Sequence, residues 1–310
     1  MIYLVTGGAG FIGSNIVKEL LQRNEKVRVL DNFATGKREN ILMYEKNPNL
    51  EIIEGDLRSL HLVRDAVKGA DYVLHQGALP SVPRSVDDPI TSNDVNILGT
   101  LNILEAAKEF KVKRVVFASS SSVYGNSEFL PKQEDMAVAP LSPYAVSKYA
   151  AERYCQIYYQ LYGLETVCLR YFNVFGPNQD PTSQYSAVIP LFIKAIYEGR
   201  QPVIYGDGLQ SRDFTYVTNN VEANLLACTA EGAVGEVFNI AIGVKYTLIE
   251  LVKEINKALG KNIEPDFEKE RSGDVKHSLA DISKAQKMLS YQVKVDFAEG
   301  IRKTVEHFTG

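Results

Sequence analysis

Short apolar runs alternate with helix-forming stretches along the first half of the chain. The runs lie at Ile2–Val5, Val27–Leu30, Leu50–Ile53, Tyr72–Leu74, Val115–Ala118 and Thr166–Leu169. Between the first two, the apolar positions of the segment 12–22 recur with the spacing of one helix face. Repeated strand–helix units predict an α/β fold, a doubly wound parallel sheet with helices on both faces. Ligands of such sheets gather beyond the carboxyl ends of the strands.

After about residue 172 this alternation becomes irregular, and Pro177, Pro181, Pro190 and Pro202 indicate loops. One later helix is well defined, because Thr247-Leu-Ile-Glu250 forms a capping box and a glycine ends the apolar stripe at residue 260. We therefore expect a first domain over residues 1–172 and a smaller α/β lobe over 173–310. Segments near 205–242 are expected to return to the first domain.

The composition argues against several classes of partner and site. The 310 residues carry 34 basic and 38 acidic side chains without a long run of one sign, which argues against nucleic-acid and membrane-surface partners. No apolar stretch approaches the roughly 20 residues that span a bilayer, and no signal peptide is visible. The three cysteines and four histidines have neither disulfide nor metal-ligand spacing. We expect a cytoplasmic protein without a metal.

A glycine-rich turn follows the first apolar run. Gly7, Gly10 and Gly13 stand at the spacing that lets a backbone approach a pyrophosphate and a helix pack against its strand. The N-terminus of that helix offers free N–H groups and partial positive charge to phosphates. Asp31, at the end of the second run, can accept hydrogen bonds from the ribose hydroxyls of NAD. The pattern predicts a Rossmann-type site that prefers NAD to NADP.

A second group of polar residues follows the fifth run. The serines at 119–122 come directly after it, and Tyr144 and Lys148 lie one helical turn apart in a helix capped by Ser142. Half-ionising a tyrosine at pH 7 requires about three pKa units, or ~4 kcal/mol, of stabilisation of the phenolate. A nearby ammonium supplies energy of that order at an effective dielectric constant of ~20. Tyr144 is therefore a candidate general base, steadied by a serine hydroxyl.

Together these motifs resemble the extended short-chain dehydrogenase/reductase superfamily. Further motifs resemble nucleotide-sugar 4-epimerases, and most of all the branch that acts on UDP-N-acetylglucosamine. These motifs are Asp31-Asn-Phe-Ala-Thr-Gly36, His75-Gln-Gly-Ala78, Ser81-Val-Pro-Arg-Ser85, Arg170-Tyr-Phe-Asn-Val-Phe-Gly176, Ser211-Arg-Asp-Phe214 and Arg271-Ser-Gly-Asp274. The resemblance covers essentially the whole chain.

The resemblance implies a role for individual residues. Ser120, Tyr144 and Lys148 match the catalytic group. NAD contacts are implied for Gly7, Gly10, Phe11, Ile12, Gly13, Asp31, Asn32, Phe33, Thr35, Gly36, Lys37, Asp56, Leu57, Gln76, Gly77, Ala78, Asn96, Tyr144, Lys148, Tyr171 and Val174. Contacts with a UDP-sugar are implied for Ser81, Ser120, Ser121, Ser122, Tyr144, Asn173, Ala187, Val188, Tyr205, Arg212, Arg271, Asp274 and Ser278.

The implied reaction is inversion at C4 of a UDP-hexose through a 4-keto sugar, with bound NAD. Ser121 and Ser122 stand where relatives that dehydrate or decarboxylate carry acids, which disfavours elimination. Ser278 is small at a position where a bulky residue narrows the sugar pocket in relatives, so a 2-acetamido group should fit. Two alternatives stay open: an epimerase of UDP-glucose and UDP-galactose, or of both sugar classes, and a non-catalytic nucleotide sensor. The resemblance also implies a homodimer formed by the helix after Asn96 and the Tyr144 helix.

Overall fold

The apolar runs of the sequence form a parallel sheet, in a computed structural model that describes residues 1–180, 188–270 and 276–310. In spatial order the strands of this seven-stranded sheet are β11 (Val237–Ile240), β6 (Thr166–Tyr171), β5 (Arg114–Ser120), β4 (Tyr72–His75), β1 (Ile2–Thr6), β2 (Lys26–Asp31) and β3 (Leu50–Glu54). All six neighbouring pairs are parallel. The order reverses between β1 and β4, which opens a crevice at the carboxyl edge between them. The predicted doubly wound sheet is confirmed.

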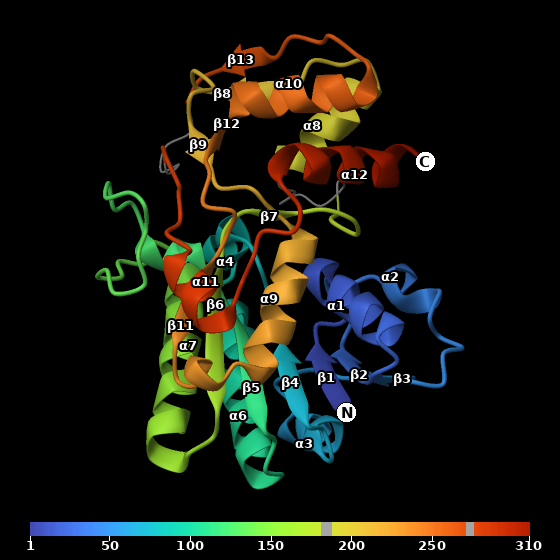
Figure 1. Cartoon of the computed structure of the whole chain (residues 1–310), viewed down its shortest axis with the longest axis vertical. Helices are drawn as coiled ribbons and strands as arrows, with labels where there is room; N and C mark the ends of the chain where they lie inside the picture. The colour runs from blue at the N-terminus through green and yellow to red at the C-terminus, as the bar shows by residue number, and fades with distance from the viewer. Residues whose placement is uncertain (181–187, 271–275) are drawn as a thin grey trace.

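Helices cover both faces of the sheet (Figure 1). α1 (Phe11–Gln22) and α9 (Val217–Thr229) pack together on one face, while α3 (Leu60–Val67), α6 (Gly99–Glu109) and α7 (Pro143–Tyr162) pack on the other. Successive strand residues therefore enter different cores, and Leu4 and Val5 of β1 belong to separate hydrophobic clusters. This two-sided burial explains why the runs are continuously apolar rather than alternating.

The last strand of the sheet comes from late in the chain. β11 pairs with β6 in the register Val237↔Cys168 to Ile240↔Tyr171, and α9 packs against β5, β6 and β11. The pairing satisfies backbone groups of β6 that would otherwise remain at an open edge. α11 (Ser283–Leu289) packs beside this strand.

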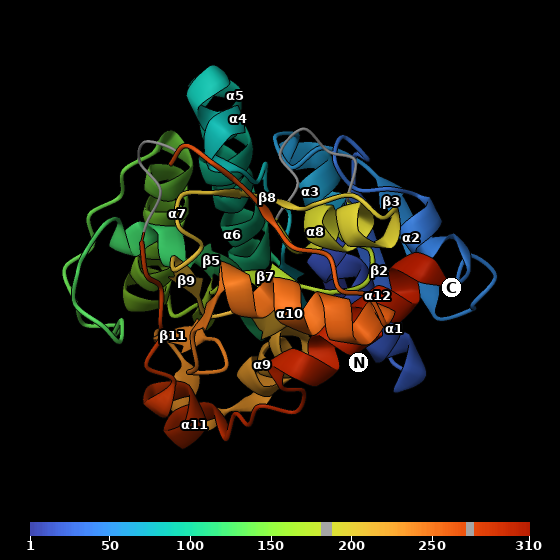
Figure 2. The same ribbon diagram turned by 90° about the horizontal axis from the view of Figure 1, so that it is seen from above.

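A set of shorter elements lies above the carboxyl edge of the sheet (Figures 1 and 2). Its helices are α8 (Val188–Tyr197), α10 (Leu248–Leu259) and α12 (Phe297–Thr309). Three two-stranded pairs accompany them: β8 (Val203–Tyr205) with β13 (Asp266–Glu268), β9 (Ser211–Arg212) with β12 (Tyr246–Thr247), and β7 (Val174–Phe175) with β10 (Thr215–Tyr216). We refer to these elements together as the upper lobe. The shorter helical segments of the chain are α2 (Glu39–Leu42), α4 (Val82–Asp87), α5 (Pro89–Asn93), η1 (Asp94–Leu98), η2 (Ser121–Tyr124) and η3 (Glu231–Ala233).

The predicted caps of α7 and α10 are confirmed. Thr247 and Glu250 form the predicted capping box of α10, and Gly260 ends that helix at φ 63°. Ser142 accepts from the Ala145 N–H at 3.1 Å and starts α7 before Pro143. Such contacts depend on neighbours in sequence, so the sequence suffices to predict them. No helix within the described ranges is long and apolar enough to cross a membrane.

Candidate functional site

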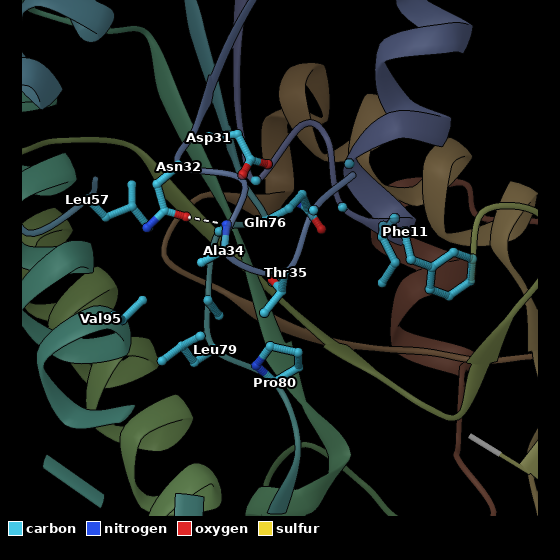
Figure 3. A pocket seen from close by; sticks show the side chains of 18 of the residues that line it. Phe11, Asp31, Asn32, Ala34, Thr35, Leu57, Gln76, Leu79, Pro80 and Val95 are labelled. Carbon is cyan, nitrogen blue, oxygen red and sulfur yellow. Dashed lines mark hydrogen bonds between the residues drawn. The ribbon is translucent and has the colours of Figure 1, made fainter. Parts of the chain in front are cut away.

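A cavity of about 730 Å³ opens at the carboxyl edge of the sheet, where the strand order reverses. Its lining includes the residues predicted for NAD except Asn96 and Val174, and also the predicted substrate contact Ser81. Figure 3 shows Asp31, at the end of β2, and Asn32 and Thr35, just after it, on the cavity wall together with Leu79 and Pro80. Segments far apart in the sequence meet here because parallel strands end at one edge.

The glycine turn fits a dinucleotide by its lack of side chains. A Cβ on Gly13 would lie 2.1 Å from the Gly7 carbonyl oxygen, and one on Gly7 would lie 2.8 Å from the Gly77 backbone. α1 begins here at Gly10 without a side-chain cap and without an acidic residue in its first turn. An uncapped, acid-free helix start presents N–H groups and positive potential to an anion. The residues present therefore fit the pyrophosphate of NAD.

Asp31 is fixed at the end of β2 by two backbone hydrogen bonds. Its carboxylate accepts from the Ala9 N–H at 2.9 Å and from the Phe33 N–H at 2.8 Å. Burial raises the pKa of this carboxyl above its usual value, and the two N–H donors oppose that rise. The group is thus held as an oriented acceptor on the cavity wall, as a ribose hydroxyl requires.

Tyr144 also lines the cavity, from the first turn of α7. Burial raises the pKa of its phenol, while a hydrogen bond with Ser120 lowers it. The Ser120 hydroxyl oxygen accepts from the Ser122 hydroxyl at 2.9 Å and from the Ser122 N–H at 3.2 Å. With its oxygen accepting, the proton of Ser120 is available to Tyr144, which favours the phenolate. Burial therefore opposes the lowering of the Tyr144 pKa that the sequence analysis expects from the Lys148 ammonium.

Lys148 is buried one turn further along α7. Its ammonium donates to the Ala118 carbonyl oxygen at 2.9 Å and lies 5.0 Å from the centre of the Phe117 ring. Burial lowers its pKa to about 8. Lys148 therefore keeps its charge at neutral pH but loses it at a moderately alkaline pH.

His75 stands behind this group, with its ring held between two threonine hydroxyls. Nδ1 lies 2.7 Å from the Thr6 hydroxyl and Nε2 lies 3.0 Å from the Thr100 hydroxyl. Burial, followed by the charge of Lys148, lowers its pKa to about 3. The ring therefore joins two side chains and is neutral at pH 7.

Two residues predicted for NAD lie outside the described cavity lining. Asn96, in η1, accepts from the Leu79 N–H at 2.8 Å and donates to the Leu79 oxygen and the Ser147 hydroxyl. It therefore connects the loop under the cavity to α7, one layer behind the surface. Val174 is half-buried in β7, where it pairs with Thr215.

The predicted UDP-sugar residues are more dispersed. Asn173, Val188, Tyr205, Arg212, Ser278 and the serines 120–122 do not contribute to the described lining, although Ser120 contacts Tyr144. Ser278 is nevertheless close to Arg212, because its N–H donates to the Ser211 oxygen at 3.0 Å. Ala187, Arg271 and Asp274 lie outside the described residues.

The cavity also contains residues that the sequence did not indicate. They are Leu30, Ala34, Asn40, Gly55, Leu79, Pro80, Arg84, Val95, Ala118, Ser119, Asn178, Gln179 and Asp180. Asp180 pairs with Lys37 at 3.1 Å, so the segment after β7 meets the loop after β2. Asn15 and Ser14 of α1 bind Pro177 and Asn178 of the same segment. No local motif marks such contacts between distant segments, although Ala34, Arg84 and Ser119 lie within motifs named in the sequence analysis.

Comparisons with known proteins agree with this geometry. The NAD dependent epimerase/dehydratase family matches residues 3–241. A putative UDP-glucose 4-epimerase of Methanocaldococcus jannaschii is 41% identical, over 97% of this chain and 96% of its own length.

Solved structures are similar along the whole chain. The UDP-N-acetylglucosamine 4-epimerase of Methanobrevibacter ruminantium, solved with UDP-N-acetylmuramic acid, is 45% identical with a TM-score of 0.94, covering 99% of this chain and 97% of that one. The UDP-glucose 4-epimerase of Thermus thermophilus, solved with NAD, is 40% identical with a TM-score of 0.89, covering 100% of this chain and 99% of that one.

Proposed function

The chain belongs to the NAD dependent epimerase/dehydratase family and is an NAD-dependent UDP-sugar 4-epimerase; we propose that its substrates are UDP-N-acetylglucosamine and UDP-N-acetylgalactosamine. The observation that carries the chemistry is that Tyr144 and Lys148 line the cavity together with the residues predicted for NAD, and that Tyr144 contacts Ser120. Support for the acetylated sugars comes from Ser278, and from the 45% identity to an enzyme described with that substrate.

In this proposal Tyr144 takes the proton of the sugar 4-hydroxyl. The Ser122–Ser120 pair donates toward the phenol oxygen, and the Lys148 charge favours the phenolate from within the same helix. Bound NAD would accept the hydride of C4 and, when oxidised, place a positive charge near Tyr144. The 4-keto sugar then rotates so that its opposite face meets the cofactor. The hydride returns to C4, and Tyr144 returns its proton to the oxygen on the inverted carbon. Because hydride and proton both return, no external oxidant is consumed.

The upper lobe is the proposed holder of the nucleotide. We assign residues 173–310 mainly to UDP-sugar binding, with the segments near 205–242 returning to the NAD-binding domain of residues 1–172. Arg212 suits the diphosphate, since a guanidinium makes paired, charge-assisted hydrogen bonds to phosphate. Its strand is fixed from below, because neighbouring Asp213 accepts from the N–H groups of Ile242, Gly243 and Ala280.

The direct test uses purified protein and UDP-N-acetylglucosamine without added NAD. Appearance of the galacto epimer supports both the reaction and a retained cofactor. UDP-glucose, run in parallel, measures the alternative substrate class. Turnover of UDP-glucose alone would overturn the acetylated assignment, and no turnover of any UDP-hexose would favour the nucleotide sensor.

Ser278→Tyr sharpens the substrate test. The backbone of Ser278 is tied to Ser211, so it cannot easily move away to accommodate a large side chain. We expect this variant to lose activity on the acetylated pair at least about tenfold more than on the plain hexoses, a difference of ~1.4 kcal/mol. Ser278→Ala is the matched control and should keep both activities. Equal losses on both sugar classes would contradict the pocket argument.

We also propose a cytoplasmic homodimer. α6 and α7 lie side by side, and Leu98 before α6 and Val146 and Leu161 on α7 are exposed apolar side chains. A twofold pairing of the two helices with their copies would cover this face. Sedimentation should then give twice the chain mass of 34.5 kDa.

A further inference from the structure

Three side chains form a closed ring of hydrogen bonds in the wall of the cavity. The Tyr171 hydroxyl donates to Gln76 Oε1 at 3.1 Å, Gln76 Nε2 donates to Asn224 Oδ1 at 2.9 Å, and Asn224 Nδ2 donates to the Tyr171 oxygen at 2.6 Å. Gln76 follows β4, Tyr171 ends β6 and Asn224 lies in α9. Gln76 and Tyr171 line the cavity with Tyr144, whereas Asn224 stands behind them.

Asn224 is the buried member that completes this ring. It has no exposed surface, and its Nδ2 also donates to the Asn220 carbonyl oxygen at 2.7 Å. Its acceptor and both of its donor hydrogens are therefore in use. Without this amide, the Gln76 N–H would lose its buried acceptor and Tyr171 would lose its donor. Orphaned buried groups reorient to find new partners, so the cavity wall would lose its fixed arrangement.

The ring distinguishes two tyrosines that face the same space. Burial raises the pKa of both phenols, and hydrogen bonds lower both: those with Asn224 and Gln76 for Tyr171, and that with Ser120 for Tyr144. The difference lies in the partners, because the Tyr171 hydroxyl both donates to Gln76 and accepts from Asn224 within the closed ring, whereas Tyr144 contacts Ser120. Tyr144 is thus arranged to exchange a proton with a substrate, whereas Tyr171 is arranged to stay neutral as part of the cavity wall.

We infer that Asn224 is a positioning residue for the hydride exchange. From α9 it holds Gln76 and Tyr171 in one orientation, so that the nicotinamide and the sugar keep the alignment that the returning hydride needs. This inference rests on the proposed epimerisation and on the NAD dependence of the family. A residue that acts through such a wall affects the chemical step more than the binding of the distant nucleotide.

The test is Asn224→Leu in the purified full-length enzyme. We expect kcat to fall about tenfold, corresponding to the loss of roughly one to two hydrogen bonds' net contribution. The KM for the UDP-sugar should stay within about twofold, since the ring does not contact the nucleotide. The fraction of cofactor left reduced during turnover, seen as near-ultraviolet absorbance, should rise severalfold. Isothermal titration with NAD should show weaker binding, independent of turnover.

Two further variants make the result decisive. Tyr171→Phe should give the same changes, and the double variant should be no worse than either single one, because both break the same ring. Asn224→Asp keeps an acceptor for Gln76 but cannot donate to Tyr171, and serves if the leucine variant fails to fold. Asn219→Leu is the matched control: this buried α9 asparagine binds Lys294 and Val295, away from the cavity. It should lower stability and leave the reduced fraction unchanged.

Normal kcat, reduced fraction and NAD affinity in both Asn224 variants would overturn the inference. So would additive losses with Tyr171→Phe, or a loss of activity that follows stability as in the Asn219 control. If the wild type epimerises no UDP-hexose, the proposed function fails instead. NAD titration of the same variants would still show whether the ring orders the cavity.

Discussion

The seven-stranded sheet with its flanking helices, called the lower domain below, and the upper lobe arrange their polar residues in different ways. In the lower domain, residues from the ends of β1, β2, β4, β5 and β6 meet in one cavity because a parallel sheet brings its carboxyl ends to one edge. In the upper lobe, Tyr205, Arg212 and Ser278 lie on short two-stranded pairs and the segments beside them. Topology thus brings the residues predicted for NAD together, whereas contacts between short strands and loops must position the residues predicted for the UDP-sugar. If the proposed assignment holds, the sugar-binding residues can change without altering the sheet that positions Tyr144.

The largest expected effect tests whether the chemistry belongs to the lower domain alone. Tyr144→Phe removes the proposed base and should lower kcat by about 10³-fold for every UDP-hexose. Binding of NAD and of UDP should change little, because the phenyl ring keeps the shape of the wall. Kinetics and titration on the same preparation measure both. Retained turnover would show that another group moves the proton.

A smaller effect compares the two regions through their buried titratable groups. His75 has a pKa of about 3 in the folded protein against 6.5 when free, so acidification protonates the unfolded chain first and lowers stability. Asp213 has a pKa raised to about 6 from 3.8, so its contribution increases stability as the pH falls through that window. The two buried groups therefore contribute opposite pH dependence to stability.

His75→Gln isolates one side of this contrast. An amide can still bond both threonines and does not titrate. Between pH 6.5 and about pH 4, we expect the free energy of unfolding to decrease by roughly 3 kcal/mol more in the wild type than in the variant. Chemical denaturation at several pH values measures it. Parallel pH curves for the two proteins would show that His75 is not the acid-sensitive group.

The smallest effect concerns the contact that closes the adenosine side of the cavity. Asp180→Asn removes the ion pair with Lys37 and should speed NAD release by up to about fivefold, as fits an exposed pair of about 0.2–1 kcal/mol. Glu54→Gln is the matched control. It breaks the exposed ion pair of Glu54 with Arg38, the residue after Lys37, and Glu54 is not among the residues that line the cavity. Release is followed after trapping free NAD. Equal rates in the two variants would contradict a role for Asp180.

The sequence predicts the lower domain well, and the reasons are local. The runs before Gly7 and Asp31, the turn between them and the cap of α7 each depend on neighbouring residues. The cavity could be foreseen because strand ends meet by topology. Asn224 and Asp180 could not, since both act through segments that reach the cavity only by long-range packing. The neutral state of His75 was equally inaccessible, because it follows from complete burial in the finished core.

The origin of β11 has a consequence for engineering and for synthesis on the ribosome. β11 begins at Val237, 71 positions after β6 begins at Thr166. A chimera cut at residue 172 would leave β6 as an open edge that invites aggregation. Exchange of sugar specificity between relatives must therefore graft around α9 and β11 and not through them. A nascent chain likewise cannot complete the seven-stranded sheet until β11 has left the exit tunnel.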